Sequence, residues 1–376
     1  MARLFQPLDL RGLRLKNRVV VSPMQTYSAP EGLATPWHQA HLARFALGGA
    51  GLVMAEATAV TPEGRSTALD LGLWEDAQAR ALEGVAEAVH ACGAAFGVQL
   101  QHAGRKAATS APWEGFRPVS DPAGADVLGP TDVPAAPGAH VPRALGPSDR
   151  IRIVEAYAAA ARRADAAGVD LVEIHMAHGY LLHSFLSPLS NTRVDAYGGP
   201  IEGRMRLPLE VVAAVRAAWP PHKPLACRIS SVDGIGVGWS LEDSQVLVTA
   251  LIAAGVDLVD CSSGGMILPR SDMMVPRGPG FQMPFASRLK RTTGACVIAV
   301  GGITEAAEAE AALAREDADL VALGREMLAN PNWALHAADV LLGAPGWDLW
   351  PKPFGWWLAR RSRAASRSAQ DGSNRS

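Results

Sequence analysis

The chain of 376 residues is predicted to be an α/β protein, a (β/α)8 TIM barrel with an N-terminal hairpin and a long loop after strand 3. Three observations predict this fold. Eight short apolar runs alternate with segments of helical character. The runs are almost continuously apolar, as in parallel strands that are covered on both faces. The sequence Ala-Gly-Val-Asp-Leu-Val occurs at 167–172 and again at 254–259, where a helix ends at glycine and a buried strand follows.

The expected strands share β-branched and other apolar residues and lie at 19–23, 51–57, 95–100, 171–175, 224–229, 258–262, 297–300 and 320–324. Helices are expected between them, the clearest at 77–91, 148–167 and 241–254. The helix at 148–167 is expected to begin at a capping Ser148. A doubly wound sheet is the alternative, but it would carry phosphate-binding glycines after its first strand, and Pro23-Met-Gln-Thr has none.

Composition limits the class of protein. The net charge is −2 and no apolar run reaches about 18 residues, so neither nucleic acid nor a membrane is an expected partner. Without a secretory segment at its start, the chain is expected to be cytoplasmic. Residues 1–358 are expected to form one domain, and the Arg/Ser-rich residues 359–376 a disordered tail. Residues 103–147, rich in proline and glycine, are expected to be a lid or binding loop.

Polar residues gather where these strands end. In a (β/α)8 barrel the loops that follow the strands converge over one face and carry the chemistry. The residues at or just beyond the strand ends are Ser22, Pro23, Met24, Gln25, Tyr27, Ala57, Gln99, His175, His178, Tyr180, Arg228, Gly302, Gly324 and Arg325. This face is therefore the expected active site.

Several of these residues suit a cofactor that carries both a ring and a phosphate. Gly302 and Gly324 follow strands 7 and 8, where this fold often binds phosphate, although tight turns would explain them equally well. Arg228 near the barrel axis needs an anionic partner. Gln99 offers a donor and an acceptor for the edge of a heterocycle.

His175 and His178 allow three interpretations: a metal pair, histidines satisfied within the core, or two hydrogen-bond donors to a substrate oxygen. The third is favoured, because no further ligand stands at metal spacing. Tyr180 follows closely and could supply a proton.

Together and in order, these segments resemble the old yellow enzyme family of FMN-dependent ene-reductases, in the branch of the bacterial xenobiotic reductases and thermophilic-like enzymes. The resemblance covers roughly residues 3–358. The matching motifs are Asn17-Arg18 with Ser22-Pro-Met24, Gln99-Leu-Gln-His-Ala-Gly-Arg-Lys106, His175-Met-Ala-His-Gly-Tyr-Leu181, Phe185-Leu-Ser-Pro-Leu-Ser-Asn191, Arg193-Val-Asp-Ala-Tyr-Gly-Gly199 and Gly324-Arg325.

The resemblance implies FMN as cofactor and NADPH or NADH as reductant. The positions it assigns to FMN are Ser22, Pro23, Met24, Gln25, Ala57, Gln99, Arg228, Gly324 and Arg325, to which the phosphate argument above adds Gly302. It implies that His175 and His178 hold the carbonyl or nitro oxygen of an α,β-unsaturated substrate, and that Tyr180 protonates it. Tyr27 would line the substrate pocket.

The resemblance also implies a homodimer or homotetramer in which Trp357 reaches a neighbouring active site. One position departs from the pattern: this branch usually has cysteine where Gln25 stands, which changes the group beside the flavin. The alternatives are a barrel lyase or metal-dependent hydrolase without flavin, and a flavin-binding protein without turnover.

Overall fold

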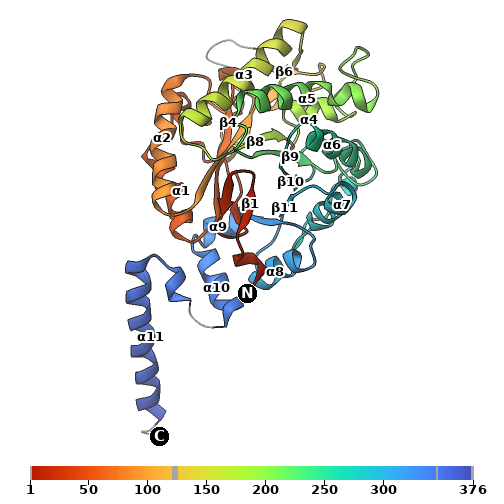
Figure 1. The fold of residues 1–376 in the computed structure, drawn as a ribbon. Helices are drawn as coiled ribbons and strands as arrows, with labels where there is room; N and C mark the ends of the chain where they lie inside the picture. The colour runs from red at the N-terminus through yellow and green to blue at the C-terminus, as the bar shows by residue number, and fades with distance from the viewer. Residues whose placement is uncertain (1, 121–125, 344–345, 374–376) are drawn as a thin grey trace.

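Eight parallel strands close into a barrel in the computed structural model, which describes residues 2–120, 126–343 and 346–373, with side chains to residue 362. The order around the barrel is β10-β11-β12-β3-β4-β5-β8-β9. Consecutive barrel strands along the chain are neighbours, and β12 pairs with β3 to close the ring. The predicted TIM barrel is confirmed (Figure 1).

All eight predicted strands are present within a few residues of the expected bounds. They are β3 (Val19–Val21), β4 (Leu52–Ala59), β5 (Ala95–Gln101), β8 (Leu171–Met176), β9 (Leu225–Ser230), β10 (Leu258–Ser262), β11 (Val297–Val300) and β12 (Leu320–Leu323). The helices are α1 (Pro36–Leu47), α2 (Asp76–Ala91), α3 (Pro147–Ala166), α4 (Leu181–Leu186), α5 (Ile201–Ala218), α6 (Leu241–Ala253), α7 (Met283–Thr293), α8 (Ala306–Ala314), α9 (Arg325–Ala329), α10 (Trp333–Leu342) and α11 (Lys352–Ser373).

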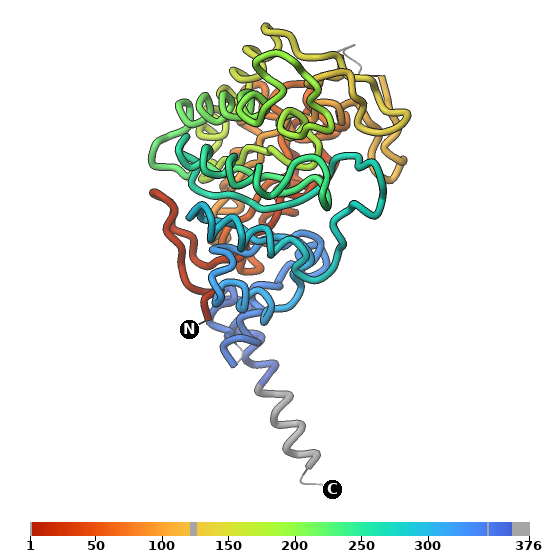
Figure 2. Tube along the Cα trace, turned by 90° about the vertical axis from the view of Figure 1, so that its right-hand side faces the viewer, coloured from red at the N-terminus to blue at the C-terminus, as the bar shows by residue number. Residues whose placement is uncertain are grey.

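The main core lies between the barrel and the helices around it. Strand residues such as Val53, Phe96 and Val172 face outward into this layer, where they meet the apolar faces of the helices. Burying both faces of every strand explains why the strands read as continuous apolar runs. At the chain start, the single turn η1 (Arg3–Phe5) is fixed beside α8 by hydrogen bonds from two backbone N–H groups to Glu310. Figure 2 shows this N-terminal segment, in red, at the edge of the molecule.

A second, smaller core fills the barrel interior at its N-terminal end. The antiparallel hairpin of β1 (Leu8–Leu10) and β2 (Leu13–Leu15) lies there, as predicted, and its Leu10 and Leu15 join a cluster with Leu52, Leu171 and Leu258. This apolar floor closes one end of the barrel, so polar side chains are confined to the upper interior and the opposite mouth.

The loop after β5 holds more local structure than its composition suggests. Two 3-10 turns, η4 (Gly104–Lys106) and η5 (Pro112–Glu114), and the short strands β6 (Leu128–Gly129) and β7 (Arg143–Ala144) interrupt it; residues 121–125 lie outside the description. The expected cap of the next helix is wrong. Helix α3 begins at Pro147 with Gly146 as its N-cap, because the Asp149 carboxylate accepts from the Gly146 N–H at 2.8 Å.

Helix α11 ends the described part of the chain. It continues from Lys352 to Ser373 and points away from the barrel in Figure 1. The domain boundary at 358 and the disordered tail at 359–376 stay predictions, and residues 374–376 of that tail lie outside the described residues. Alanine and arginine favour helix, which explains how a polar segment of this composition can be helical. No helix in the described parts of the chain is long and apolar enough to cross a membrane.

Candidate active site and cofactor cradle

A cavity of about 970 Å³ opens at the C-terminal ends of the barrel strands. Its volume is that of a site for a small molecule or cofactor. Most of its wall comes from the β10–α7 loop and from the turns after β3, β11 and β12. Eight of the residues expected at the site line it: Ser22, Pro23, Met24, His178, Arg228, Gly302, Gly324 and Arg325.

The remaining expected residues lie close by, with one exception. Ala57 is the register partner of Gln99 on neighbouring strands, and Gln99 is buried. Tyr27 lies in the turn after β3 with a φ of 52°, a strained value for tyrosine. Trp357 is the exception: it stands on α11, where its ring packs edge-on against Trp356 and remains 67% exposed.

Three rings form one cluster after β8. The ring centroids of His175 and His178 are 5.1 Å apart in an edge arrangement, and those of His175 and Tyr180 are 5.0 Å apart. His178 has a φ of 61°, so the chain turns sharply there and both imidazoles face the same region. Ser262 donates to Gln282 at 3.1 Å, which leaves its oxygen to accept from His178 Nε2 at 2.7 Å.

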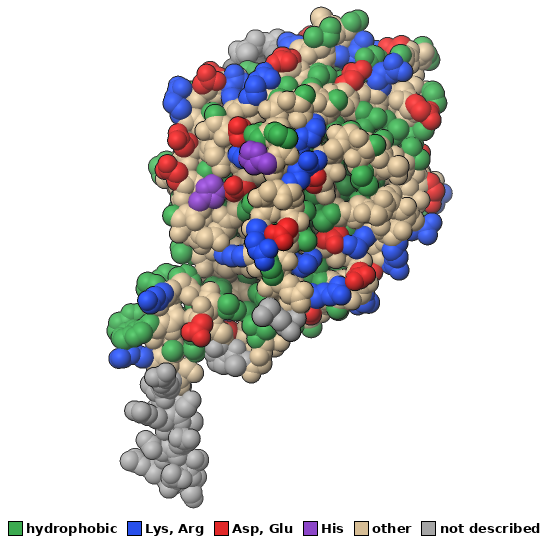
Figure 3. Space-filling model, viewed as in Figure 1, with side chains coloured by type: hydrophobic (Ala, Val, Ile, Leu, Met, Phe, Trp, Pro, Cys, Tyr) green, Lys and Arg blue, Asp and Glu red, His purple; other side chains and the backbone are tan. Residues whose placement is uncertain are grey.

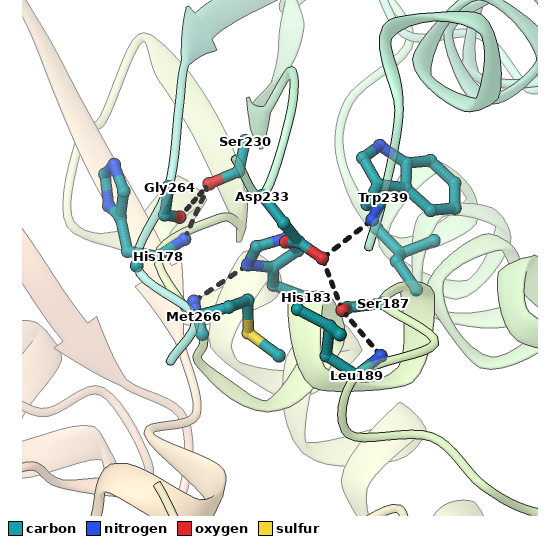
Figure 4. Close-up of polar contacts among 12 residues, drawn as sticks. His178, His183, Ser187, Leu189, Ser230, Asp233, Trp239, Gly264 and Met266 are labelled. Carbon is teal, nitrogen blue, oxygen red and sulfur yellow. Dashed lines mark hydrogen bonds and ion pairs between the residues drawn. The ribbon is translucent and has the colours of Figure 1, made fainter. Parts of the chain in front are cut away.

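Two layers of hydrogen bonds hold the strained turn at His178 (Figure 4). The His178 N–H donates to Ser230 Oγ at 2.9 Å, and Ser230 donates to the Gly264 carbonyl at 2.7 Å. Below the turn, His183 Nδ1 accepts from the Gly179 N–H at 2.8 Å, and its other nitrogen lies 2.9 Å from Asp233, fully buried. Because the support comes from three separate strands and loops, the histidine is fixed before a substrate binds.

Burial sets the protonation states of the cluster. Burial, helped by the nearby charge of Arg228, holds the pKa values of His175 and His178 well below 6.5. Burial raises the pKa of Tyr180, the Asp70 carboxylate raises it further, and a hydrogen bond with Ser66 opposes the shift. At neutral pH the cluster therefore consists of two neutral imidazoles and one protonated phenol.

Lys106 joins the β5 loop to this cluster. Its ammonium donates to the carbonyl oxygens of His178 and Gly265, the latter at 2.8 Å, and lies 5.4 Å from the centre of the Tyr180 ring. Burial and the neighbouring Arg105 lower the pKa of Lys106 to about 8. The site thus keeps a cation beside Tyr180 over most of the physiological range.

Gln25 is oriented by a buried carboxylate. Its amide nitrogen is buried without a hydrogen bond among the described residues, and its position near Asp70 lowers the pKa of that carboxyl, which burial raises. Asp70 is fully buried and also accepts from the Ser66 N–H and the Thr67 hydroxyl, each at 2.7 Å. The nitrogen is therefore turned toward Asp70, which leaves the amide oxygen as the free group of Gln25.

The barrel interior below the cavity carries three ionisable side chains, Glu173, Arg228 and Asp260. Arg228 Nε lies 3.3 Å from Asp260, and Glu173 accepts from Gln99 Nε2 at 2.7 Å. The anionic partner that the sequence required for Arg228 is thus partly supplied by the protein itself. These contacts leave part of the Arg228 guanidinium without a hydrogen-bond partner, because its Nε makes no hydrogen bond to the described residues.

The cavity fits FMN. Ser22 Oγ and Arg228 Nε belong to residues of its wall and are buried without hydrogen bonds among the described residues, and so is His175 Nδ1 in the neighbouring ring cluster. A methyl group on Gly324 would meet only atoms at 3.7 Å or more, so the backbone there borders open space, and Gly301 and Gly302 have φ values of 111° and 72°. These backbone N–H groups and Arg325 suit a phosphate, and Gln99 suits a ring edge. In the described parts of the chain, no group of three or more His, Cys, Asp or Glu residues could hold a metal ion.

Several residues of the site were not expected from the sequence: Ser66, Asp70, Lys106, Glu173, His183, Asp233 and Asp260. Glu173 and Asp260 could have been identified from the sequence. Each lies two residues before a site residue on the same strand, His175 or Ser262, and so points into the barrel as well. His183 lies on helix α4 and the others come from loops, and only the folded chain brings them to the site.

Comparisons with known proteins agree with this geometry. The model of the NADH:flavin oxidoreductase / NADH oxidase family matches residues 3–341. An NADPH dehydrogenase of Geobacillus thermodenitrificans is 42% identical over 340 residues, which cover 90% of this chain and 94% of that relative. An NADPH dehydrogenase of Listeria innocua is 40% identical over 343 residues, covering 91% and 96% of the two chains.

Solved structures give the same result. Morphinone reductase superposes with a TM-score of 0.74 at 30% identity, covering 91% of this chain and 90% of that one. A structure of morphinone reductase in complex with tetrahydroNAD matches with the same TM-score, at 30% identity over 91% of each chain. This chain belongs to the NADH:flavin oxidoreductase / NADH oxidase family, of the old yellow enzyme type, and is an FMN-dependent NAD(P)H oxidoreductase.

Proposed function

We propose that this enzyme reduces the activated C=C bond of α,β-unsaturated carbonyl or nitro compounds and that Tyr180 protonates the product. The observation that carries the proposal is the cluster of His175, His178 and Tyr180, three uncharged hydrogen-bonding rings about 5 Å apart beside the cavity. Neutral donors suit an oxygen that becomes negative only during the reaction.

Each residue has a distinct part. Bound FMN supplies the hydride chemistry. His175 and His178 orient the activating oxygen and stabilise its developing charge, with the substrate competing for the Ser262 contact of His178. Tyr180 holds its proton until the α-carbon becomes basic, and Lys106 then stabilises the phenolate. The β10–α7 loop, residues 263–282, covers one side of the cavity and limits access of water.

Replacing His175 or His178 by alanine tests this proposal. Each change removes one donor, and we expect cyclohexenone reduction by the pre-reduced enzyme to slow by about 10²-fold or more. Reduction of the bound FMN by NADPH, followed in the same stopped-flow instrument, is the internal control and should slow less. Wild-type rates with cyclohexenone in both variants would contradict the assignment and leave a flavin enzyme with another acceptor.

We also propose a homodimer or homotetramer in which the C-terminal segment contacts a neighbouring subunit near its active site through Trp357. Large apolar side chains are exposed at the start of α11 and just before it: Leu349, Phe354, Trp356 and Trp357 are each at least half exposed. Figure 3 shows hydrophobic side chains gathered there on the surface. Such a patch is typical of a protein interface.

A further inference from the structure

Two buried carboxyl groups share one guanidinium inside the barrel. Glu173 and Asp260 are each 1% exposed and Arg228 is 8% exposed, on the adjacent strands β8, β9 and β10. Leu171 and Leu258 of the apolar floor precede the two acids by two residues on the same strands. The two acids therefore lie between the apolar floor and the cavity, and Arg228 forms part of the cavity wall.

The charges of this group do not balance. One guanidinium can neutralise one carboxylate, and Asp260 is the nearer, with Arg228 Nε 3.3 Å from its Oδ2. Among the described residues, Glu173 has only the neutral Gln99 amide as its hydrogen-bond donor, at 2.7 Å. A second charge in this environment costs several kcal/mol, so one of the two acids favours its protonated form.

The neighbouring titratable groups do not supply another charge. Burial raises the pKa of the Cys227 thiol on β9 well above 9, so it is uncharged, and His175 on β8 is neutral as well. Burial and the charge of Asp260 raise the pKa of Glu173 to about 8, while Arg228 and Gln99 oppose this shift. Burial likewise raises the pKa of Asp260.

We propose that Glu173 takes up a proton from solvent when FMN in the cavity is reduced, which keeps the charge of the barrel interior balanced. Two electrons and one proton, delivered as hydride from NAD(P)H or from an electrode with solvent protons, leave one negative charge on the flavin. Arg228 is the cation between that charge and the two acids, so the new anion competes for it. The Glu173 carboxylate then binds a second proton from solvent. The bond that forms on the protein is the O–H bond of the Glu173 carboxylic acid.

Glu173 is in this sense a positioning residue and does not itself touch the reacting atoms. Its Oε1 holds the Gln99 amide nitrogen and leaves the amide oxygen for the ring of the cofactor. Below about pH 8 Glu173 already carries its proton in the oxidised enzyme, so reduction takes up only the flavin's own proton. Above that pH reduction takes up two protons.

The test is a titration of the FMN midpoint potential between pH 6 and 10 with the holoenzyme. Each proton taken up with two electrons shifts the potential by about 30 mV for a tenfold change in proton concentration. For the wild type we expect a slope of about 30 mV per pH unit that steepens toward about 59 mV above about pH 8. A single slope of about 30 mV over the whole range overturns the proposal.

Two variants identify the group. Glu173→Gln keeps an oxygen that accepts from Gln99 but cannot take up a proton, so the steep segment should disappear. A steep segment that persists in this variant assigns the proton to another group and overturns the proposal. Asp260→Asn removes the neighbouring negative charge, so the steep segment should begin at a lower pH; an unchanged onset overturns the proposal even if Glu173→Gln loses FMN.

The proposal rests on FMN bound in the cavity and not on any enone substrate. The titration uses an electrode or dithionite, so it can succeed when cyclohexenone is not reduced and fail when it is. The two proposals are thereby tested separately.

Discussion

At the scale of the residue, Gln25 stands where this branch of the family usually has cysteine, and the orientation of its amide determines how it can act on the flavin. Its amide nitrogen is turned toward Asp70, so its free oxygen can accept a hydrogen bond but cannot donate one. The flavin N5 carries hydrogen only when reduced. The resemblance places Gln25 beside N5, where an acceptor would stabilise the reduced form and raise the potential.

We expect Gln25→Ala to lower the midpoint potential by up to about 30 mV, because a neutral hydrogen bond contributes about 0.5–1.5 kcal/mol and 30 mV equals about 1.4 kcal/mol for a two-electron couple. Redox titration at pH 7 measures this shift, with Gln25→Cys as the control that restores the residue usual in this branch. Agreement of all three potentials within about 5 mV would show that the side chain does not act on the flavin.

At the scale of the element, the turn from β12 to α9 is open where a phosphate would lie. Gly324 has a negative φ of −106°, and an added methyl group would meet Met24 and Ser22 only at 3.7 Å or more, without a clash. Gly324→Ala should therefore fold normally while its methyl group occupies the space above the backbone. We expect a weaker affinity for FMN, measured by fluorescence titration, and an unchanged melting temperature of the FMN-free protein.

Gly302→Ala provides a contrast within the same cradle. Its φ is 72°, and the new methyl group would collide with the Gly278 carbonyl oxygen. This variant should lower the melting temperature as well as the affinity for FMN. If Gly324→Ala binds FMN like the wild type, the phosphate does not lie at this turn.

The corner after β5 has a pH-dependent stability. His102 is buried, its Nδ1 accepts from the Gly104 N–H at 3.0 Å, and burial lowers its pKa to about 4, although Glu63 opposes this. The unfolded chain binds a proton near pH 6.5 that the folded chain binds only near 4. The stability due to neutral His102 is thus complete above about pH 6.5 and is lost as the pH falls toward 4.

His102→Asn keeps an acceptor for Gly104 and removes the titration. From pH 7.5 to pH 4.5 the wild type should lose up to about 3 kcal/mol more of its free energy of unfolding than the variant does. Urea denaturation of both proteins at the two pH values measures the difference. Equal losses would mean that His102 is protonated in the folded enzyme.

At the scale of the whole molecule, helix α11 points away from the barrel (Figure 1), and its aromatic side chains at 354, 356 and 357 are exposed. Truncation after Leu349 should lower the mass measured by light scattering and raise KM for cyclohexenone, because the neighbour's Trp357 would no longer border the cavity. Trp357→Ala in the full chain separates the two effects, since it should raise KM with less change in mass. A wild-type chain that is monomeric at micromolar concentration would contradict the proposed assembly.

The barrel could be predicted from the sequence, because each strand carries its own apolar run and several of the turns between helix and strand carry a glycine, such as Gly168 and Gly255. Strand ends such as Gln99, His175 and Arg228 could be placed at one mouth for the same reason: parallel strands of a closed barrel all end there. Because the fold is regular, the position of a residue along its strand predicts where that residue lies in the barrel. Residues outside that regularity could not be placed in this way.

Only the tertiary structure decided how the site residues are charged and held. The Asp70 that turns Gln25, the Lys106 beside Tyr180 and the Asp233 behind His183 come from loops whose paths follow no period. The state of Glu173 depends on Asp260 and Arg228 of two other strands. Burial and the distances between charges fix a pKa, and both arise only when segments far apart in the sequence pack together.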